Sequence, residues 1–176
     1  LKNNRKNTWG TGLIFDHEID SIQNVTVAAG FTREISENAN KTAYYSNAYA
    51  LGLAYNFVHT TYGLDLAHKD TKNKDGAGNK VKNNEVTAVI RQGLNEDWNV
   101  YAMYSYKTEK TLPVGSAYSK STDRQFLVGT EYYVYNQGSL KVKPFLEWQA
   151  TRTKYENSTV DRSRDFKTVI GLRAYW

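Results

Sequence analysis

The sequence predicts an all-β protein whose strands form an antiparallel, up-and-down β-barrel. Apolar and polar residues alternate with a period of two along most of the chain, as in strands with one apolar face. The 14 Tyr, 6 Phe and 4 Trp residues give a composition typical of strands. Turn-forming polar residues separate the alternating segments at regular intervals. We therefore expect one barrel domain over residues 1–176.

Nine strands are predicted from the alternation. The clearest is the last, in which Phe166, Ile170 and Leu172 share one face and Asp165 and Lys167 lie on the other. The apolar and polar positions of the other segments separate in the same way. The predicted strands span residues 8–19, 24–34, 44–57, 60–69, 85–91, 98–107, 124–135, 140–152 and 164–176.

The connections between these strands are predicted to alternate in length. Short turns are expected near residues 20–23, 56–59, 94–97 and 136–138, and longer polar loops at 35–42, 70–83, 110–121 and 156–163. Short periplasmic turns and longer external loops are typical of outer-membrane barrels. Most of the predicted strands are long enough for a tilted bilayer crossing, which takes about 9–11 residues.

The direction in which the apolar face points separates two kinds of barrel. In a soluble lipocalin-like barrel or a sandwich this face would point inward and form a core. Trp98, Trp148 and Tyr132 instead fall on the apolar face near strand ends, as aromatic girdles at two membrane interfaces would. The opposite face carries charge in nearly every strand, as a polar lumen would. The sequence thus favours a transmembrane barrel of the outer-membrane type.

Other classes of protein fit the sequence less well. Every apolar stretch is too short for a spanning helix, and the absence of cysteine removes disulfides and Cys-based zinc sites. His17, His59 and His68 fall on different strands, so we expect neither an enzyme nor a metal site. The net charge of +5 is scattered over the chain without a nucleic-acid-binding module. We expect no cofactor and no nucleic-acid partner.

The end of the chain carries a family resemblance. Its last six residues, Gly-Leu-Arg-Ala-Tyr-Trp, resemble the final strand of Gram-negative porins, with Trp in place of the commoner Phe. In that family the barrel-assembly machinery reads this strand, which implies an assembly signal at Leu172, Ala174 and Trp176. Residues 143–147 also resemble the penultimate strand of porins and of oligogalacturonate-type channels. For a general porin, the resemblance implies a homotrimer.

The number of predicted strands is odd, whereas bacterial single-chain barrels have an even number. We therefore expect this chain to be the C-terminal portion of a barrel with twelve or sixteen strands, or residues 1–7 to hide a tenth strand. The chain begins with Leu1, so any export signal is expected to lie outside this sequence. Pro144 cannot donate to a strand ladder and predicts a bulge or a position near the rim.

The alternation also predicts which charges line the lumen. Glu131 is predicted to lie across from Lys143, and Glu85 across from Lys107. Such pairs either hold a plugged barrel together or create a field across an open pore. Small residues at 26–30 and 46–54 on the same face would leave room for a pore. The candidate pore-lining residues are Asp65, Glu85, Arg91, Lys107, Glu131, Lys141, Lys143, Glu147, Lys167 and Arg173.

These observations predict a passive diffusion channel for small hydrophilic or charged solutes. The expected partners are the lipid bilayer, lipopolysaccharide, the barrel-assembly machinery and further copies of the chain. The alternative is a closed structural or adhesive barrel whose external loops, such as residues 70–83, contact ligands. The lysines of that loop lack the Gly-Lys-Ser/Thr of a phosphate-binding loop and are expected to be solvated or to touch lipopolysaccharide.

Overall fold

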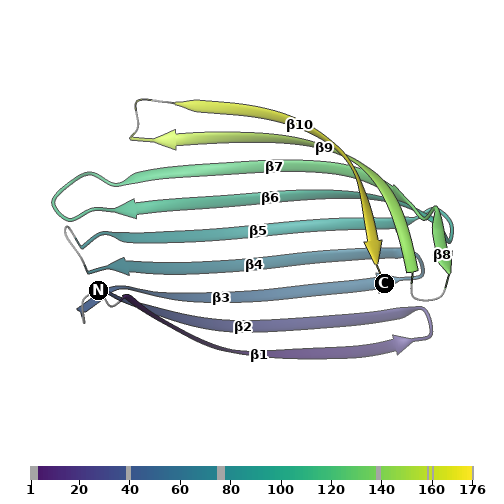
Figure 1. The fold of residues 1–176 in the computed structure, drawn as a ribbon, viewed down its shortest axis with the longest axis horizontal. Coiled ribbons are helices and arrows are strands. Elements are labelled where there is room, and N and C mark those ends of the chain that lie inside the picture. Colours follow the sequence, from purple (N-terminus) through teal and green to yellow (C-terminus); the bar gives the residue numbers. More distant parts are fainter. Residues whose placement is uncertain are drawn as a thin grey trace.

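Nine long antiparallel strands form one open sheet in the computed structural model, and a short tenth strand is attached to it (Figure 1). The structure describes residues 4–38, 41–74, 78–137, 140–157, 159 and 161–175. Each strand pairs with the next along the chain, except that β7 pairs with β9 and the short β8 also pairs with β9. The strands are β1 (Asn4–Asp20), β2 (Gln23–Asn38), β3 (Lys41–Phe57), β4 (Thr60–Asn73), β5 (Lys80–Gly93), β6 (Trp98–Leu112), β7 (Ser119–Tyr132), β8 (Tyr135–Gln137), β9 (Leu140–Glu156) and β10 (Arg162–Tyr175).

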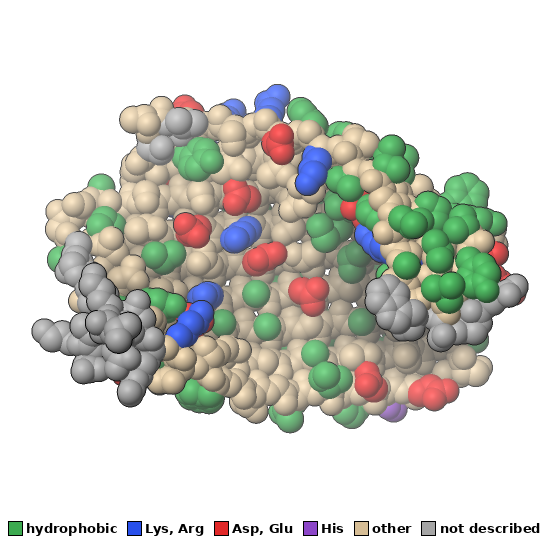
Figure 2. All heavy atoms as spheres, in the orientation of Figure 1, with side chains coloured by type: hydrophobic (Ala, Val, Ile, Leu, Met, Phe, Trp, Pro, Cys, Tyr) green, Lys and Arg blue, Asp and Glu red, His purple; other side chains and the backbone are tan. Residues whose placement is uncertain are grey.

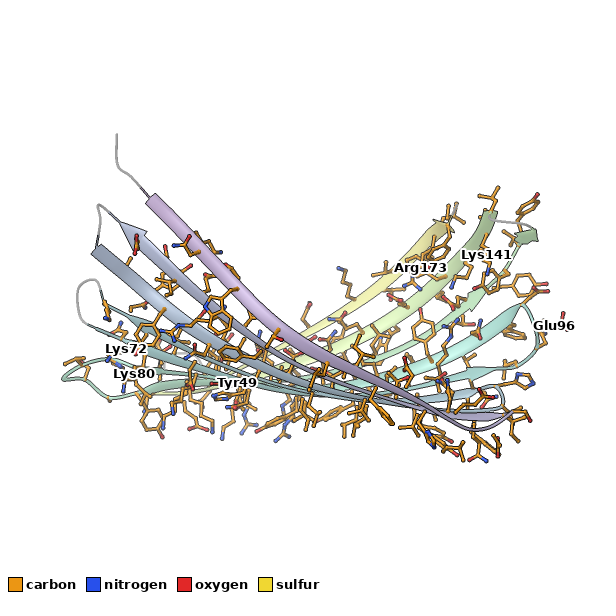
Figure 3. The ribbon with its side chains drawn as sticks, turned by 90° about the horizontal axis from the view of Figure 1, so that it is seen from below. Tyr49, Lys72, Lys80, Glu96, Lys141 and Arg173 are labelled. Carbon is orange, nitrogen blue, oxygen red and sulfur yellow. The ribbon has the colours of Figure 1, made fainter. Side chains whose placement is uncertain are left out.

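The sheet is bent into a trough, with β1 rising on one side and β9 and β10 on the other (Figure 3). The hollow side, here called the concave face, carries interspersed acidic and basic side chains (Figure 2). The convex face carries the apolar rows. One row runs from Tyr104 to Phe126, Ala150 and Phe166, which are paired across four neighbouring strands. The all-β, up-and-down architecture predicted from the alternation is confirmed.

Burial in this sheet is the reverse of that in a soluble domain. Across the described ranges no hydrophobic side chain is buried, and the buried residues are Ser46, Ser105, Thr122, Glu131 and Lys143. Large apolar side chains of the convex face, such as Ile170 and Leu172, are exposed. The sheet by itself therefore has no hydrophobic core, because its apolar rows face away from the hollow.

The apolar band runs obliquely across the strands. Successive strand pairs connect Phe15 of β1 to Phe166 of β10 along one row perpendicular to the strands. In β1 most of the exposed apolar residues of the convex face are Phe15 and residues before it, with Ile19 as the exception at the bulge, whereas in β10 they are Phe166 and residues after it. A band that shifts along successive strands implies strands tilted relative to it, as in barrels, where tilt and register stagger are linked.

The strands are longer than predicted and most of the loops are shorter. The strands of the main path have 14–17 residues, and the predicted loop at 70–83 is mostly strand, since β4 ends at Asn73 and β5 begins at Lys80. Polar residues extend the ladders beyond the apolar alternation. Lys6 Nζ, for example, lies 3.1 Å from Glu34 Oε2 near the end of β1 and β2. The expected contrast between short turns and long loops is correspondingly weak.

The connection from β7 to β9 also differs from the prediction. Glu131 pairs with Phe145 rather than with Lys143, because β7 ends at Tyr132 and the chain continues into β8. The β7–β9 ladder stops at Phe145, next to Pro144, as a proline without an N–H requires. The other predicted pair, Glu85 with Lys107, is confirmed. No helix in the described part of the chain is long and apolar enough to cross a membrane.

Candidate functional site

The ten charged residues predicted to line a pore share the concave face. Paired residues of adjacent strands point to the same side of a sheet, and the register links all ten positions in this way. They fall into two groups. Five form a hydrogen-bonded network near the end of the sheet that holds the short turns: Arg91, Glu131, Lys143, Glu147 and Arg173. The other five lie apart from this network: Asp65, Glu85, Lys107, Lys141 and Lys167.

Glu131 lies at the centre of the network. Its side chain is only 3% exposed and accepts hydrogen bonds from Arg91, from Lys143 Nζ at 3.1 Å and from Arg173 Nη1 at 3.1 Å. These three cations come from β5, β9 and β10, so one carboxylate of β7 joins four strands. Charge-assisted hydrogen bonds of this kind are the strong ones in proteins, and here they offset part of the cost of burying the carboxylate.

Lys143 is buried with its partner. Its side chain is 7% exposed, and the ammonium lies 4.8 Å from the centre of the Tyr133 ring and 5.1 Å from that of Tyr175. Two aromatic faces and the Glu131 carboxylate therefore replace water around this cation. Lys143 was predicted to line the pore, but its ammonium is enclosed by protein. Its surroundings fit a structural role better than contact with a passing solute.

Tyr101 completes the network, although the alternation did not single it out. Its hydroxyl donates to Glu147 Oε1 at 2.6 Å, and Arg173 Nη2 donates to the same oxygen at 2.7 Å. Tyr101 reaches Glu147 from β6 by lying across Gly129 of β7, where a Cβ atom would be 2.5 Å from the ring. Because Tyr101, Gly129 and Glu147 stand on three different strands, only the strand register shows that they are neighbours.

The second group of charges is more accessible. Asp65, Lys107, Lys141 and Lys167 are exposed, and Glu85 is half-buried across from Lys107. Lys141 lies on the raised side of the trough with Arg173 of the network (Figure 3). Within the network, Arg91 and Arg173 keep 43% and 36% of their side chains exposed. These seven residues offer charge to the hollow, in contrast to the buried Glu131 and Lys143.

The middle of β2 and β3 presents small side chains to the concave face. Gly30 pairs with Ala50 and Ala28 with Gly52, so the small residues predicted on two strands lie side by side. The carboxylate of Asp65 approaches Gly52 closely, since a Cβ atom there would lie 2.9 Å from Asp65 Oδ1. Small side chains on one half and long charged ones on the other leave the hollow unfilled over β2 and β3.

The structure also shows where the residues of the predicted assembly signal and His68 lie. Leu172 and Ala174, predicted as part of an assembly signal, lie exposed on the convex face of β10, and Trp176 lies outside the described residues. His68 contacts Asn84 and Asp70 through its two ring nitrogens, at 2.6 and 2.8 Å. In the ranges that the structure describes, no group of three or more His, Cys, Asp or Glu side chains is arranged to hold a metal ion.

Comparison with known proteins adds nothing to this assignment, since neither a protein-family model nor a curated protein matches the chain.

Proposed function

We propose that this sheet is part of the wall of a transmembrane β-barrel in a Gram-negative outer membrane, and that the barrel is a passive diffusion channel for small hydrophilic or charged solutes. The reversed burial is the observation that carries the proposal. A continuous apolar convex face needs a cover, and hydrocarbon chains would supply it at every strand. A soluble barrel of the lipocalin type would need the apolar rows on the concave face instead.

The aromatic residues of the convex face support the same proposal. Trp98 and Tyr132 pair near the turn end of the sheet, and Tyr106 lies further along β6. Trp98 and Tyr106 are eight residues apart, or ~27 Å along the strand and ~20 Å along the membrane normal for a strand tilted by ~40°. The apolar band of outer-membrane barrels is ~25 Å tall and has an aromatic girdle at each interface. Trp9, Phe31 and Tyr49 form a further aromatic series on β1, β2 and β3, with ring centres 5.0–5.3 Å apart.

The free edges of β1 and β10 bear on how such a barrel closes. In hydrocarbon every backbone N–H and C=O must be paired, so neither edge can face lipid. Nine strands in alternating directions leave β1 and β10 running the same way. An all-antiparallel closure thus needs an odd number of further strands between them. One, three or seven would complete barrels of ten, twelve or sixteen strands, all even numbers.

A channel is favoured over a closed structural barrel by the concave face. Small residues of β2 and β3 lie beside the charged half, where Lys107 and Lys167 are exposed. A packed interior would be expected to bury such groups. The same proposal includes three kinds of partner. The barrel-assembly machinery would recognise Leu172 and Ala174, lipopolysaccharide would surround the loops, and further copies of the chain would form an oligomer. The small residues of β2 and β3 lie on the concave face, so they would not form a contact between barrels.

Planar-bilayer recording of the intact protein tests the channel directly. We expect stepwise openings, and we expect Lys107→Glu to shift the reversal potential in a salt gradient toward cation preference, because an exposed positive charge of the lumen becomes negative. Lys82→Glu is the matched control, since Lys82 is an exposed lysine of the convex face. A folded, inserted protein that stays silent would favour the closed alternative. A reversal potential that responds equally to both variants would remove Lys107 from the pore.

A further inference from the structure

A basic cluster lies on the convex face, at the loop end of β7, β9 and β10. The pore-lining charges lie on the concave face, whereas this cluster lies on the convex face. Most side chains of the convex face are apolar, so a group of cations there is unexpected. Glu156 is the acidic residue within it, and Lys120 Nζ lies 3.2 Å from Glu156 Oε1. The cations of the basic cluster are Lys120, Arg124, Arg152, Lys154, Arg162 and Arg164.

The register places like charges directly opposite each other in this cluster. Arg124 pairs with Arg152, and Arg152 pairs with Arg164 on its other side, so three arginines form one row across three strands. In the next row Lys154 pairs with Arg162. Like charges on facing positions destabilise a sheet, and the structure records a carboxylate partner within the cluster for Lys120 alone among its described side chains. The arrangement would be relieved by an anion bound from outside.

The surroundings of the cluster specify what kind of anion fits. Lys120, Arg124, Arg152, Lys154 and Arg162 line one pocket together with Tyr106, Thr122 and Glu156. The Arg124 guanidinium lies 5.8 Å from the centre of the Tyr106 ring. One row further along the strands, ~7 Å away, Phe126, Ala150 and Phe166 begin the apolar band. A ligand that used both features would combine a phosphate-bearing head with hydrocarbon chains.

We propose that the basic cluster binds the phosphate-bearing headgroup of a membrane lipid, whose acyl chains lie along Phe126 and Phe166. The proposal rests on the proposed function, in which the convex face contacts lipid. Guanidinium groups suit the site because each can donate two parallel hydrogen bonds to phosphate oxygens. Lipid bound here would hold β7, β9 and β10 together at the membrane surface, where their own side chains repel one another.

The test compares lipids retained by the intact protein in native mass spectrometry, after insertion into vesicles containing equal amounts of phosphatidic acid and phosphatidylcholine. We expect phosphatidic acid to be retained about tenfold more than phosphatidylcholine, and the preference to fall to about twofold in Arg124→Gln/Arg152→Gln/Arg164→Gln. The control, Lys72→Gln/Lys80→Gln/Lys82→Gln, removes three cations at the same end of β4 and β5 and should keep the preference (Figure 3).

Several outcomes would overturn the assignment. Equal retention of both lipids by inserted wild-type protein, or a preference that survives the triple arginine change, would show that the cluster does not select phosphate lipids. Inorganic phosphate at millimolar concentration that abolished the preference would assign the site to free phosphate. If the triple variant fails to insert, Arg152→Gln alone should still reduce the preference. A protein that never enters vesicles would instead overturn the proposed function, so the two failures are distinguishable by scoring insertion separately.

Discussion

Replacing Glu131 with alanine is expected to lower the free energy of unfolding of the intact protein by about 3–5 kcal/mol, which is the usual cost of breaking a buried ion pair by removing one partner. Glu131 is 3% exposed and joins cations from three other strands. Without it the Lys143 ammonium stays enclosed, and among the described side chains no other carboxylate forms an ion pair with it. The loss should therefore exceed that of any single surface charge.

Denaturant unfolding in phospholipid vesicles, followed by tryptophan fluorescence, measures this effect. Glu131→Gln is expected to lose less than Glu131→Ala, because the amide oxygen can still accept some of the hydrogen bonds. Glu109→Ala is the matched control, since Glu109 is an exposed carboxylate of the same face. If Glu131→Ala and Glu109→Ala destabilised equally, the network would have no structural role, and the case for Lys143 and Glu131 as pore-lining groups would strengthen.

The substitution Val128→Lys is expected to destabilise the membrane-inserted protein by about 2–4 kcal/mol, which is the cost of a cation on the lipid face near the bilayer midplane. Val128 lies on the convex face of β7, within the apolar band and next to Trp148 on β9. A charge there would have to leave water for hydrocarbon, or bend the bilayer to keep its hydration.

The neighbouring position supplies the control for this change. Leu127 belongs to the same strand but lies on the concave face, so Leu127→Lys should cost less than about 1 kcal/mol, because lumen positions tolerate charge. Both free energies come from unfolding titrations in the same vesicles. Equal costs for the two variants would mean that the faces of β7 meet the same solvent, and the membrane assignment would then be wrong.

The alternation is enough to predict the strands and their faces. Because side chains alternate between the two faces with a period of two, the sequence pattern alone places all ten candidate charges on one face. It does not predict the ends of the strands, because polar pairs such as Lys6 with Glu34 extend the ladder without an apolar signal. It also misses β8, whose three residues are too few to show a period.

The contacts within the candidate site are harder to predict than its face. Glu131 and Lys143 do meet, but as diagonal neighbours, because the ladder pairs Glu131 with Phe145. The role of Tyr101 depends on the gap above Gly129, which only the register reveals. The basic cluster is hidden in the sequence for the same reason: its cations are spread over three strands, and only the pairing of β7, β9 and β10 brings them into neighbouring rows.

Nitroxide scanning of β5 tests the central claim, that lipid covers the convex face and water fills the concave one. The chain has no cysteine, so single cysteines can be labelled directly in the intact protein. In vesicles, labels at positions 86, 88 and 90 should collide more with oxygen, which concentrates in hydrocarbon, and labels at 85, 87 and 89 more with a water-soluble nickel chelate. Accessibility that fails to alternate along β5, or that alternates in the opposite phase, would contradict the account.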